Sequence, residues 1–281
     1  MKQNRLFSFI IIALIYLLAT AVGVVSYYFL PFAFWLNLLL ADIIATVATF
    51  IFSVLFKNAS VYDPYWSVQP IVIGVAFACV YGLNLASAIL LIAVCIWGVR
   101  LTANWAYTFK SLNHQDWRYT MLCEKTGKFY PVINFIGIHL VPTLVVYACA
   151  LPMVAVILYK PNFNFLMLIG VLLSVCSFTM QAVADIQMHE FRKKKTGGFI
   201  RIGLWKYSRH PNYLGEICMW WGVGLCAVAL MPKLWYLLIG ALFNTLLFVF
   251  VSIPLAEGKQ SKKDGYAEYK KATRVLLPIK K

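Results

Sequence analysis

The sequence has few charged residues, and acidic residues are the scarcest of them. Charged types make up 12% of the chain and apolar types 62%, whereas soluble domains have about 25% and about 45–50%. A soluble fold of 281 residues could not cover that much apolar surface. The composition therefore excludes an ordinary soluble protein.

Several motifs of soluble enzymes are also missing. The sequence contains no G-x-x-x-x-G-K-[ST], no G-x-G-x-x-G between a strand and a helix, and no H-E-x-x-H. Its seven cysteines form no C-x-x-C pair and lie mostly in apolar runs, so we interpret them as small buried side chains. The four histidines are scattered, and we predict no metal site.

Apolar stretches long enough to cross a membrane dominate what remains. A span needs roughly 20 apolar residues, and all the stretches except the third reach that length. The basic segment Met1–Arg5 precedes an uncharged stretch that is too long for a signal-peptide core. We therefore predict an all-α, polytopic helical bundle of seven to eight spans. The predicted spans cover residues 6–30, 32–56, 66–81, 84–109, 131–159, 163–185, 212–230 and 234–255.

The distribution of basic residues gives the predicted orientation. With eight spans, the segments on the side of the N-terminus hold 22 of the 25 Lys and Arg residues, and the opposite side holds only Lys160 and Lys233. Basic loops face the cytoplasm, so both termini are expected there. The net charge of +15 then serves topology and contact with membrane lipid, and nucleic acid is not an expected partner. The membrane would be the inner or plasma membrane of a bacterium, or the endoplasmic reticulum of a eukaryote.

Four ionisable residues lie within or at the ends of the spans, where charge is costly and often functional. They are Asp42, Arg100, Asp185 and Glu216. Asp42 has a structural interpretation as a hydrogen-bond pair with Asn37. The structural interpretation of Arg100 is a side chain that extends to the cytoplasmic interface.

The densest polar region runs from residue 181 to 216. Gln181, Asp185, His189 and Arg192 recur at i, i+4, i+8 and i+11, which places them on one face of a helix. After a basic loop, Pro211 suits the first position of the next helix.

Asn212 and Glu216 follow on that next helix, four residues apart and on one face. Basic side chains suit phosphates, and carboxylates and amides suit hydroxyl and amino groups. We therefore expect a nucleotide-type cofactor here. The alternative is a loop that is basic for topology and lipid contact, which applies best to Lys193, Lys194 and Lys195.

Residues 203–222, GLWKYSRHPNYLGEICMWWG, carry a family resemblance. They resemble the steroid 5-alpha-reductase-like integral membrane proteins, as do a D-P-x-W-S entry (residues 63–67), a D-x-Q segment (185–187) and a Tyr-rich tail (266–278). The resemblance extends over most of the chain from about residue 40. It implies NADPH as cofactor, bound by a C-terminal domain (111–281), with N-terminal helices (1–110) on the substrate side. The implied cofactor-binding residues are Gln181, Asp185, Arg192, Arg209, His210, Asn212, Tyr213, Glu216 and Tyr266.

The resemblance also implies reduction of a conjugated C=C bond in a lipid-soluble steroid-, enone- or acyl-like substrate. Steroid reductases polarise the substrate carbonyl with a glutamate and a tyrosine. Asp63 lies in the glutamate's region, and Trp97 stands in the tyrosine's place, where an indole cannot act as the acid. Tyr62, Tyr65, Tyr107 and Tyr119 are therefore the candidate proton donors, and we select Tyr62 and Tyr119 with Asp63 as the catalytic residues.

Two other classes of function remain open. Isoprenylcysteine carboxyl methyltransferases share the R-H-P-x-Y-x-G pattern and a Tyr- and Pro-rich tail, which makes a membrane methyltransferase using S-adenosylmethionine the first alternative. The second is a lipid binder or transporter that lacks enzymatic activity. The tail after residue 257 is expected to lie on the bilayer or to close over the site.

Overall fold

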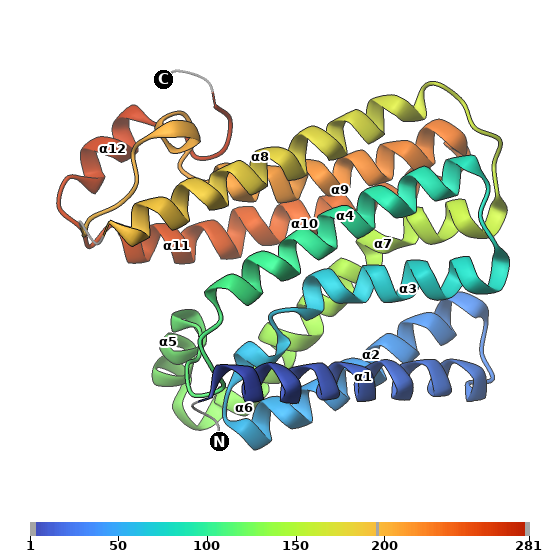
Figure 1. Ribbon diagram of the computed structural model, residues 1–281, viewed down its shortest axis with the longest axis horizontal. Coiled ribbons are helices and arrows are strands. Elements are labelled where there is room, and N and C mark those ends of the chain that lie inside the picture. Colours follow the sequence, from blue (N-terminus) through green and yellow to red (C-terminus); the bar gives the residue numbers. More distant parts are fainter. Residues whose placement is uncertain (1–3, 195–196, 279–281) are drawn as a thin grey trace. The chain divides into compact units, whose positions relative to one another are not determined.

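The computed structural model describes residues 4–194 and 197–278, and these residues are helical with connecting turns and loops (Figure 1). The predicted all-α fold is confirmed. The α-helices are α1 (Arg5–Phe29), α2 (Phe34–Phe56), α3 (Tyr65–Tyr81), α4 (Leu85–Thr108), α5 (Trp117–Thr126), α6 (Tyr130–Ile133), α7 (Val141–Tyr159), α8 (Met167–Lys193), α9 (Pro211–Leu230), α10 (Ile239–Leu247), α11 (Ile253–Gln260) and α12 (Tyr266–Ala272).

Within the described residues, eight helical stretches are long and apolar enough to cross a membrane, as predicted. The short third span is among them, because a 3₁₀ helix at Ala59–Tyr62 precedes α3 and lengthens it. The chain therefore has the architecture of a multi-pass membrane protein. The side on which its termini lie stays a prediction.

The fifth and eighth spans are not regular α-helices throughout. Each contains a π-helix, at Asn134–Leu140 and at Phe248–Ser252. In both cases a proline, Pro142 or Pro254, occupies the second position of the α-helix that follows. Proline lacks the N–H of the regular i to i−4 bond, and a wider turn before it accommodates that loss.

The chain divides into two compact units, each built from segments that are distant in sequence. Unit 1 comprises residues 1–73 and 101–147, and unit 2 comprises residues 74–100 and 148–281. The functional division at residue 110 that the resemblance implies stays a prediction.

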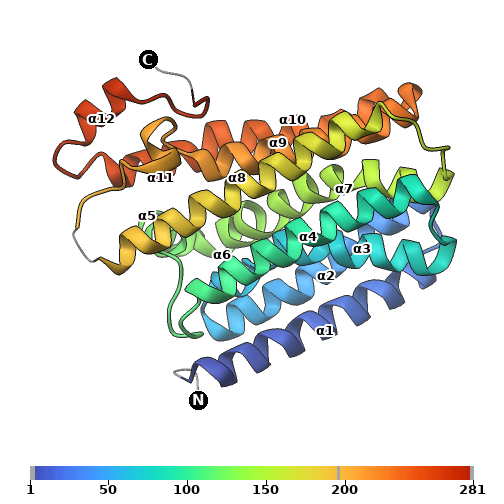
Figure 2. The same cartoon turned by 45° about the horizontal axis from the view of Figure 1, so that its top comes forward.

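Close packing of α8 against α9 organises unit 2, and the two antiparallel helices lie side by side in both views (Figures 1 and 2). Glycine permits the approach at two levels. A Cβ atom at Gly215 would lie 2.7 Å from the carbonyl oxygen of Ser177, and one at Gly222 would lie 2.6 Å from that of Gly170. Small residues let helix backbones meet in this way. Gly222 therefore serves the packing of α9 against α8.

Replacing Gly215 with alanine is expected to lower the free energy of unfolding by about 1–3 kcal/mol, because the added methyl group meets backbone that cannot move aside. Thermal unfolding in detergent measures the effect. Gly258→Ala is the matched control, since a Cβ atom at this helical position has no atom within 4 Å. Equal thermal midpoints for the two variants would contradict the close contact.

In unit 1 the chain between α2 and α3 turns into the protein interior instead of staying at its surface. Residues 58–62 are buried, and side chains from other segments satisfy their backbone and polar groups. Asn58 Nδ2 donates to the carbonyl oxygen of Leu112 (2.7 Å), Asp116 N donates to Ser60 Oγ (2.8 Å), and Tyr16 Oη donates to the carbonyl oxygen of Val61 (3.1 Å). Irregular backbone of this kind needs such partners when water is excluded.

Asp42 does not pair with Asn37, contrary to our structural interpretation. Its carboxylate accepts hydrogen bonds from Tyr65 Oη (2.7 Å) and Gln69 Nε2 (2.5 Å) on α3. Asn37 instead bonds the backbone of Leu30 and Phe32 in the turn before α2. The two residues are five apart on one helix and so point about 140° apart around its axis.

Candidate functional site

Glu216 of α9 is the centre of a polar cluster in unit 2. Its Oε2 atom accepts hydrogen bonds from Trp97 Nε1 of α4 (3.0 Å) and Gln181 Nε2 of α8 (2.8 Å). Its Oε1 atom accepts one from Trp220 Nε1, one turn along α9 (2.9 Å). Glu216 is 5% exposed, so three neutral donors from three helices replace water around a buried carboxylate.

The two indole rings hold this arrangement in place. Trp97 and Trp220 pack edge to face, with 4.8 Å between ring centroids, and both are almost fully buried. Aromatic pairs of this geometry add stability beyond the area they bury. Trp97 is thus a hydrogen-bond donor to the Glu216 carboxylate.

A second pair of charges lies one turn further along the same helices. Arg100 Nη2 of α4 forms an ion pair with the Asp185 carboxylate of α8, and both side chains are mostly buried. Arg100 follows Trp97 by three residues and Asp185 follows Gln181 by four, so the ion pair and the Glu216 cluster form two successive layers. The interpretation of Arg100 as a side chain that extends to the membrane interface is wrong, because Asp185 binds it inside the unit.

Three buried polar atoms in these layers lack a hydrogen-bond partner among the described residues. They are Arg100 Nη1, Gln181 Oε1 and Asn212 Oδ1. Asn212 precedes Glu216 by one turn, and because α8 and α9 are antiparallel it lies level with Asp185. Buried polar atoms are almost always paired, and each exception requires an explanation such as a bound ligand.

The loop before α9 is fixed against α8 beside this cluster. Gly203 has a positive φ of 61°, a conformation that favours glycine, and it begins the turn. Leu204 N then donates to Gln187 Oε1 (2.9 Å), and Trp205 Nε1 donates to the carbonyl oxygen of Ala184 (3.0 Å). The G-L-W part of the motif therefore attaches the loop to α8 through Gln187 and Ala184.

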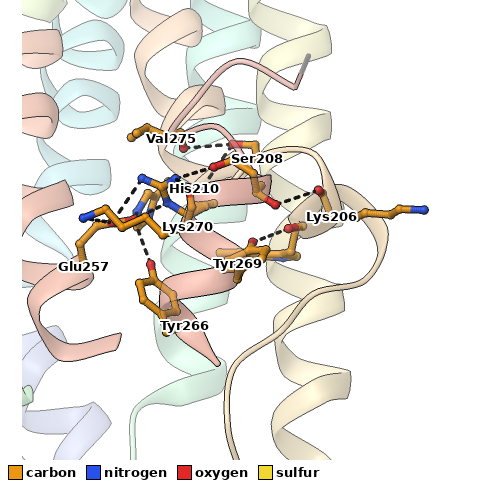
Figure 3. A network of polar contacts seen from close by, with 11 residues as sticks. Lys206, Ser208, His210, Glu257, Tyr266, Tyr269, Lys270 and Val275 are labelled. Atoms are coloured by element: carbon orange, nitrogen blue, oxygen red, sulfur yellow. Dashed lines mark hydrogen bonds and ion pairs between the residues drawn. The ribbon is translucent and has the colours of Figure 1, made fainter. Parts of the chain in front are cut away.

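Glu257 of α11 is the centre of a second polar network (Figure 3). Its Oε1 atom accepts from Arg209 Nε (2.7 Å), bonds His210 Nε2 (2.9 Å) and accepts from Tyr266 Oη (2.9 Å). Its Oε2 atom lies 3.5 Å from Lys270 Nζ. Three of the predicted cofactor-binding residues therefore converge on one carboxylate that the sequence analysis did not identify.

In this arrangement protein acceptors surround the guanidinium group of Arg209. Nη2 bonds the second oxygen of Glu257 (3.3 Å), and Nη1 donates to the carbonyl oxygens of Lys270 (3.1 Å) and Thr273. With Nε also bonded to Glu257, protein acceptors engage every guanidinium nitrogen. The Arg209 side chain is only 4% exposed, so it is buried within this network.

Backbone contacts extend this network along the tail. Arg209 N donates to the carbonyl oxygen of Arg274 (2.9 Å), and His210 N donates to that of Val275 (3.2 Å). Tyr269 Oη donates to the carbonyl oxygen of Trp205. We call residues 266–275 with Arg209, His210 and Glu257 the tail clasp. It fixes the turn from which Asn212 and Glu216 follow.

The tail clasp depends on tyrosine hydroxyls that act as donors. Burial raises the pKa of Tyr269 to about 12, and burial followed by the bond to Glu257 raises the pKa of Tyr266 above its ordinary value. Both phenols therefore stay protonated at physiological pH and continue to donate.

The remaining predicted cofactor residues have separate positions. Arg192 is exposed in the last turn of α8, and His189 precedes it on the same helix. Tyr213 stacks on His210, with ring centroids 5.2 Å apart and planes 7° apart, and also contacts Phe248. Tyr213 therefore supports the tail clasp, and Arg192 is a cation open to solvent.

The predicted catalytic residues belong to unit 1. Tyr119 Oη of α5 donates to Asp63 Oδ1 (2.6 Å) at the start of α3, so two of them are joined directly. Tyr62 is next to Asp63 in sequence, but its hydroxyl shares a hydrogen bond with Thr143 Oγ1 (2.8 Å). The structure therefore groups Asp63 with Tyr119 and separates Tyr62 from them.

Comparisons with known proteins match this chain to a family model and to an uncharacterised relative. A model of a protein family of unknown function, DUF1295, matches residues 49–273. An uncharacterised protein of Schizosaccharomyces pombe is 28% identical over 225 residues. That alignment covers 69% of this chain and 64% of the relative, so the chain spans a little under two thirds of the relative's length.

Proposed function

The chain belongs to the DUF1295 family, and we propose that it is a membrane-embedded, NADPH-dependent reductase of a conjugated C=C bond in a lipid-soluble substrate. The observation that supports this most is the set of unpartnered atoms beside Glu216. The likeness of residues 203–222 to the steroid 5-alpha-reductase-like proteins supports it independently.

The unpartnered atoms fit the carboxamide of a nicotinamide ring. Gln181 Oε1 and Asn212 Oδ1 are acceptors, and Arg100 Nη1 is a donor. A primary carboxamide offers an NH₂ group to the first two and a carbonyl oxygen to the third. The donors and acceptor of the carboxamide therefore complement the unpartnered atoms of the protein.

The fixed charges around the cluster have complementary roles in the proposal. Arg100 and Asp185 neutralise each other, so the layer carries no net charge of its own. The phosphates would be held by solvent-facing cations such as Arg192. Hydride transfer to one carbon of the double bond is the chemistry that a bound NADPH supplies.

Reduction of the double bond also consumes a proton, and Tyr119 is the donor in this proposal. Its hydroxyl is 2.6 Å from Asp63 Oδ1, and a carboxyl group in that position orients a phenol and relays protons to it. Tyr62 is not the proton donor in this proposal, because its hydroxyl is bonded to Thr143. The proposal keeps both termini on the cytoplasmic side, which epitope accessibility in sealed vesicles of known orientation tests.

Ligand-induced stabilisation of the Asn212→Ala variant tests the cofactor site. NADPH at about 100 times its dissociation constant should stabilise the wild-type protein by roughly 2.7 kcal/mol. The variant should lose most of that gain and keep its own thermal midpoint, because Asn212 Oδ1 has no protein partner to lose. Thermal shift in detergent with NADPH, NADH and S-adenosylmethionine gives the answer.

The matched control is Asn244→Ala on α10, which also truncates a buried asparagine with one unpartnered amide atom. It should keep the full NADPH response, even if its own midpoint falls. Equal NADPH responses in both variants would place the cofactor elsewhere. Stabilisation by S-adenosylmethionine alone would replace the reductase with the methyltransferase.

A further inference from the structure

A second buried polar group lies in unit 1. Its core is a pair of stacked tyrosine rings, Tyr62 and Tyr65, with centroids 5.0 Å apart and planes 16° apart. The Tyr65 hydroxyl donates to Asp42, and the ring of His139 lies 4.6 Å from that of Tyr62. The stacked rings therefore connect a carboxylate on α2 with an imidazole in the π-helix before α7.

This group lies deep within its span. Asp42 precedes the end of α2 by about four turns, or roughly 21 Å of helix rise. Tyr65, which binds it, is the first residue of α3, so the connecting segment 57–64 returns along α2 to that depth. Non-helical backbone at membrane depth occurs where it is buried in protein or lines a polar site.

Asp42 has no cationic partner among the residues that the structure describes. Both of its carboxylate oxygens accept bonds from neutral groups, Tyr65 and Gln69, and the residue is 6% exposed. Buried carboxylates are normally paired with a cation or a metal ion, because neutral donors compensate only part of their lost hydration. The described residues around Asp42 thus provide no positive charge that would neutralise its carboxylate.

The unpartnered atoms of this group are acceptors. Gln69 donates through Nε2 to Asp42, which leaves Oε1 without a partner, and Gln69 is 6% exposed. His139 lies 2.9 Å through Nδ1 from the carbonyl oxygen of Asn134, which can only accept, so Nδ1 carries the proton and the unpartnered Nε2 is an acceptor. His139 is fully buried, and π-helices such as the one that holds it are frequent at functional sites.

We infer that this group in unit 1 is a binding site for the ammonium group of a lipid-soluble primary amine. Such a ligand brings the positive charge that Asp42 lacks and the N–H donors that Gln69 and His139 lack. An apolar chain on the amine suits the apolar environment of a membrane span.

The test uses two photoreactive, alkyne-tagged probes that differ at one group, octadecylamine and octadecanol, on the full-length protein in lipid nanodiscs without NADPH. The amine should label peptides from unit 1, and an excess of untagged octadecylamine should compete it away. Octadecanol should label at background. Because no nicotinamide cofactor is present, failure here leaves the reductase proposal untouched, and failure of that proposal leaves this site untouched.

Variants decide which atoms are responsible. Asp42→Asn should reduce specific labelling by at least about tenfold, as expected when one partner of a buried charge pair is removed. His139→Phe keeps a ring against Tyr62 and removes the acceptor, and it should also weaken labelling. Thr49→Val is the matched control, because its hydroxyl bonds only the Ala45 carbonyl oxygen within α2. It should label like the wild type.

Thermal unfolding of every variant first establishes that the variant is folded. If Asp42→Asn does not fold, His139→Phe and Gln69→Met carry the test, since both remove an acceptor and leave the carboxylate in place. Equal labelling by the amine and the alcohol would make this a neutral-lipid site and overturn the inference. Labelling that none of the variants reduces would overturn it as well.

Discussion

Replacing Arg209 with methionine is expected to lower the free energy of unfolding by about 3–5 kcal/mol, the largest effect of any single substitution at the tail clasp. Removing one partner of a buried ion pair leaves the other charge uncompensated. Arg209 and Glu257 have side-chain exposures of only 4% and 11%, so little water is available to replace the lost bonds. Three guanidinium nitrogens lose protein partners at once.

Titration with a denaturing detergent, followed by tryptophan fluorescence, measures this loss. Lys271→Met is the matched control, because Lys271 is an exposed cation of the same tail and its loss should change stability by less than about 0.5 kcal/mol. Limited proteolysis adds a local readout, since the tail should be cleaved faster in the Arg209 variant only.

The double variant Arg209→Met, Glu257→Leu separates the contribution of the ion pair from that of the hydrogen bonds between Arg209 and the tail carbonyl oxygens. Replacing both charges removes the uncompensated carboxylate, so the double variant should be more stable than the sum of the two single losses predicts. Additive losses would mean that Arg209 acts through the tail carbonyl oxygens alone. A loss below about 1 kcal/mol for Arg209→Met would contradict the tail clasp itself.

Replacing Glu216 with leucine is the second substitution with a large expected effect, on the order of 3–6 kcal/mol. Three buried donors, from Trp97, Gln181 and Trp220, then lose their acceptor, and each unsatisfied donor costs about 1–3 kcal/mol. Glu216→Gln should cost less, because the amide oxygen of the new side chain can still accept from two of the three. Its amide nitrogen then faces the third donor.

A double-mutant cycle identifies that third donor. In the Glu216→Gln variant, the amide is best oriented with its oxygen toward Trp97 and Gln181, the two donors that share Oε2 in the wild type. Its NH₂ group then opposes the indole N–H of Trp220. Trp220→Phe removes that N–H and should recover about 1 kcal/mol in the glutamine background while costing stability in the wild type. The same sign in both backgrounds would contradict the hydrogen-bond assignment.

The sequence predicted the spans well, because apolar runs and loop charge are local signals. It also predicted that polar residues of two successive helices meet in the region 181–216, and Gln181 is hydrogen-bonded to Glu216 there. Pro211 begins α9 as its fixed φ suggested. These successes follow from helical periodicity alone.

Periodicity does not reveal partners on distant segments. Trp97 is hydrogen-bonded to Glu216 and Glu257 to Arg209, across sequence separations of 119 and 48 residues. The motif singled out Arg209, but its burial against Glu257 could not be predicted, because burial is a tertiary property. The one available signal for Trp97 was its place three residues before the intramembrane Arg100, which puts both on one helix face.

The route of the tail also sets an order for biosynthesis. Translation proceeds at about 5–20 residues per second, so the ribosome reaches Val275 roughly 3–13 seconds after Arg209. During that interval the guanidinium group of Arg209 has neither its carboxylate nor its carbonyl oxygens, and the first turn of α9 has no anchor. A ribosome that stops between α9 and α11 would therefore leave a nascent chain with an unneutralised arginine in its interior, a defect by which quality-control machinery can recognise incomplete chains.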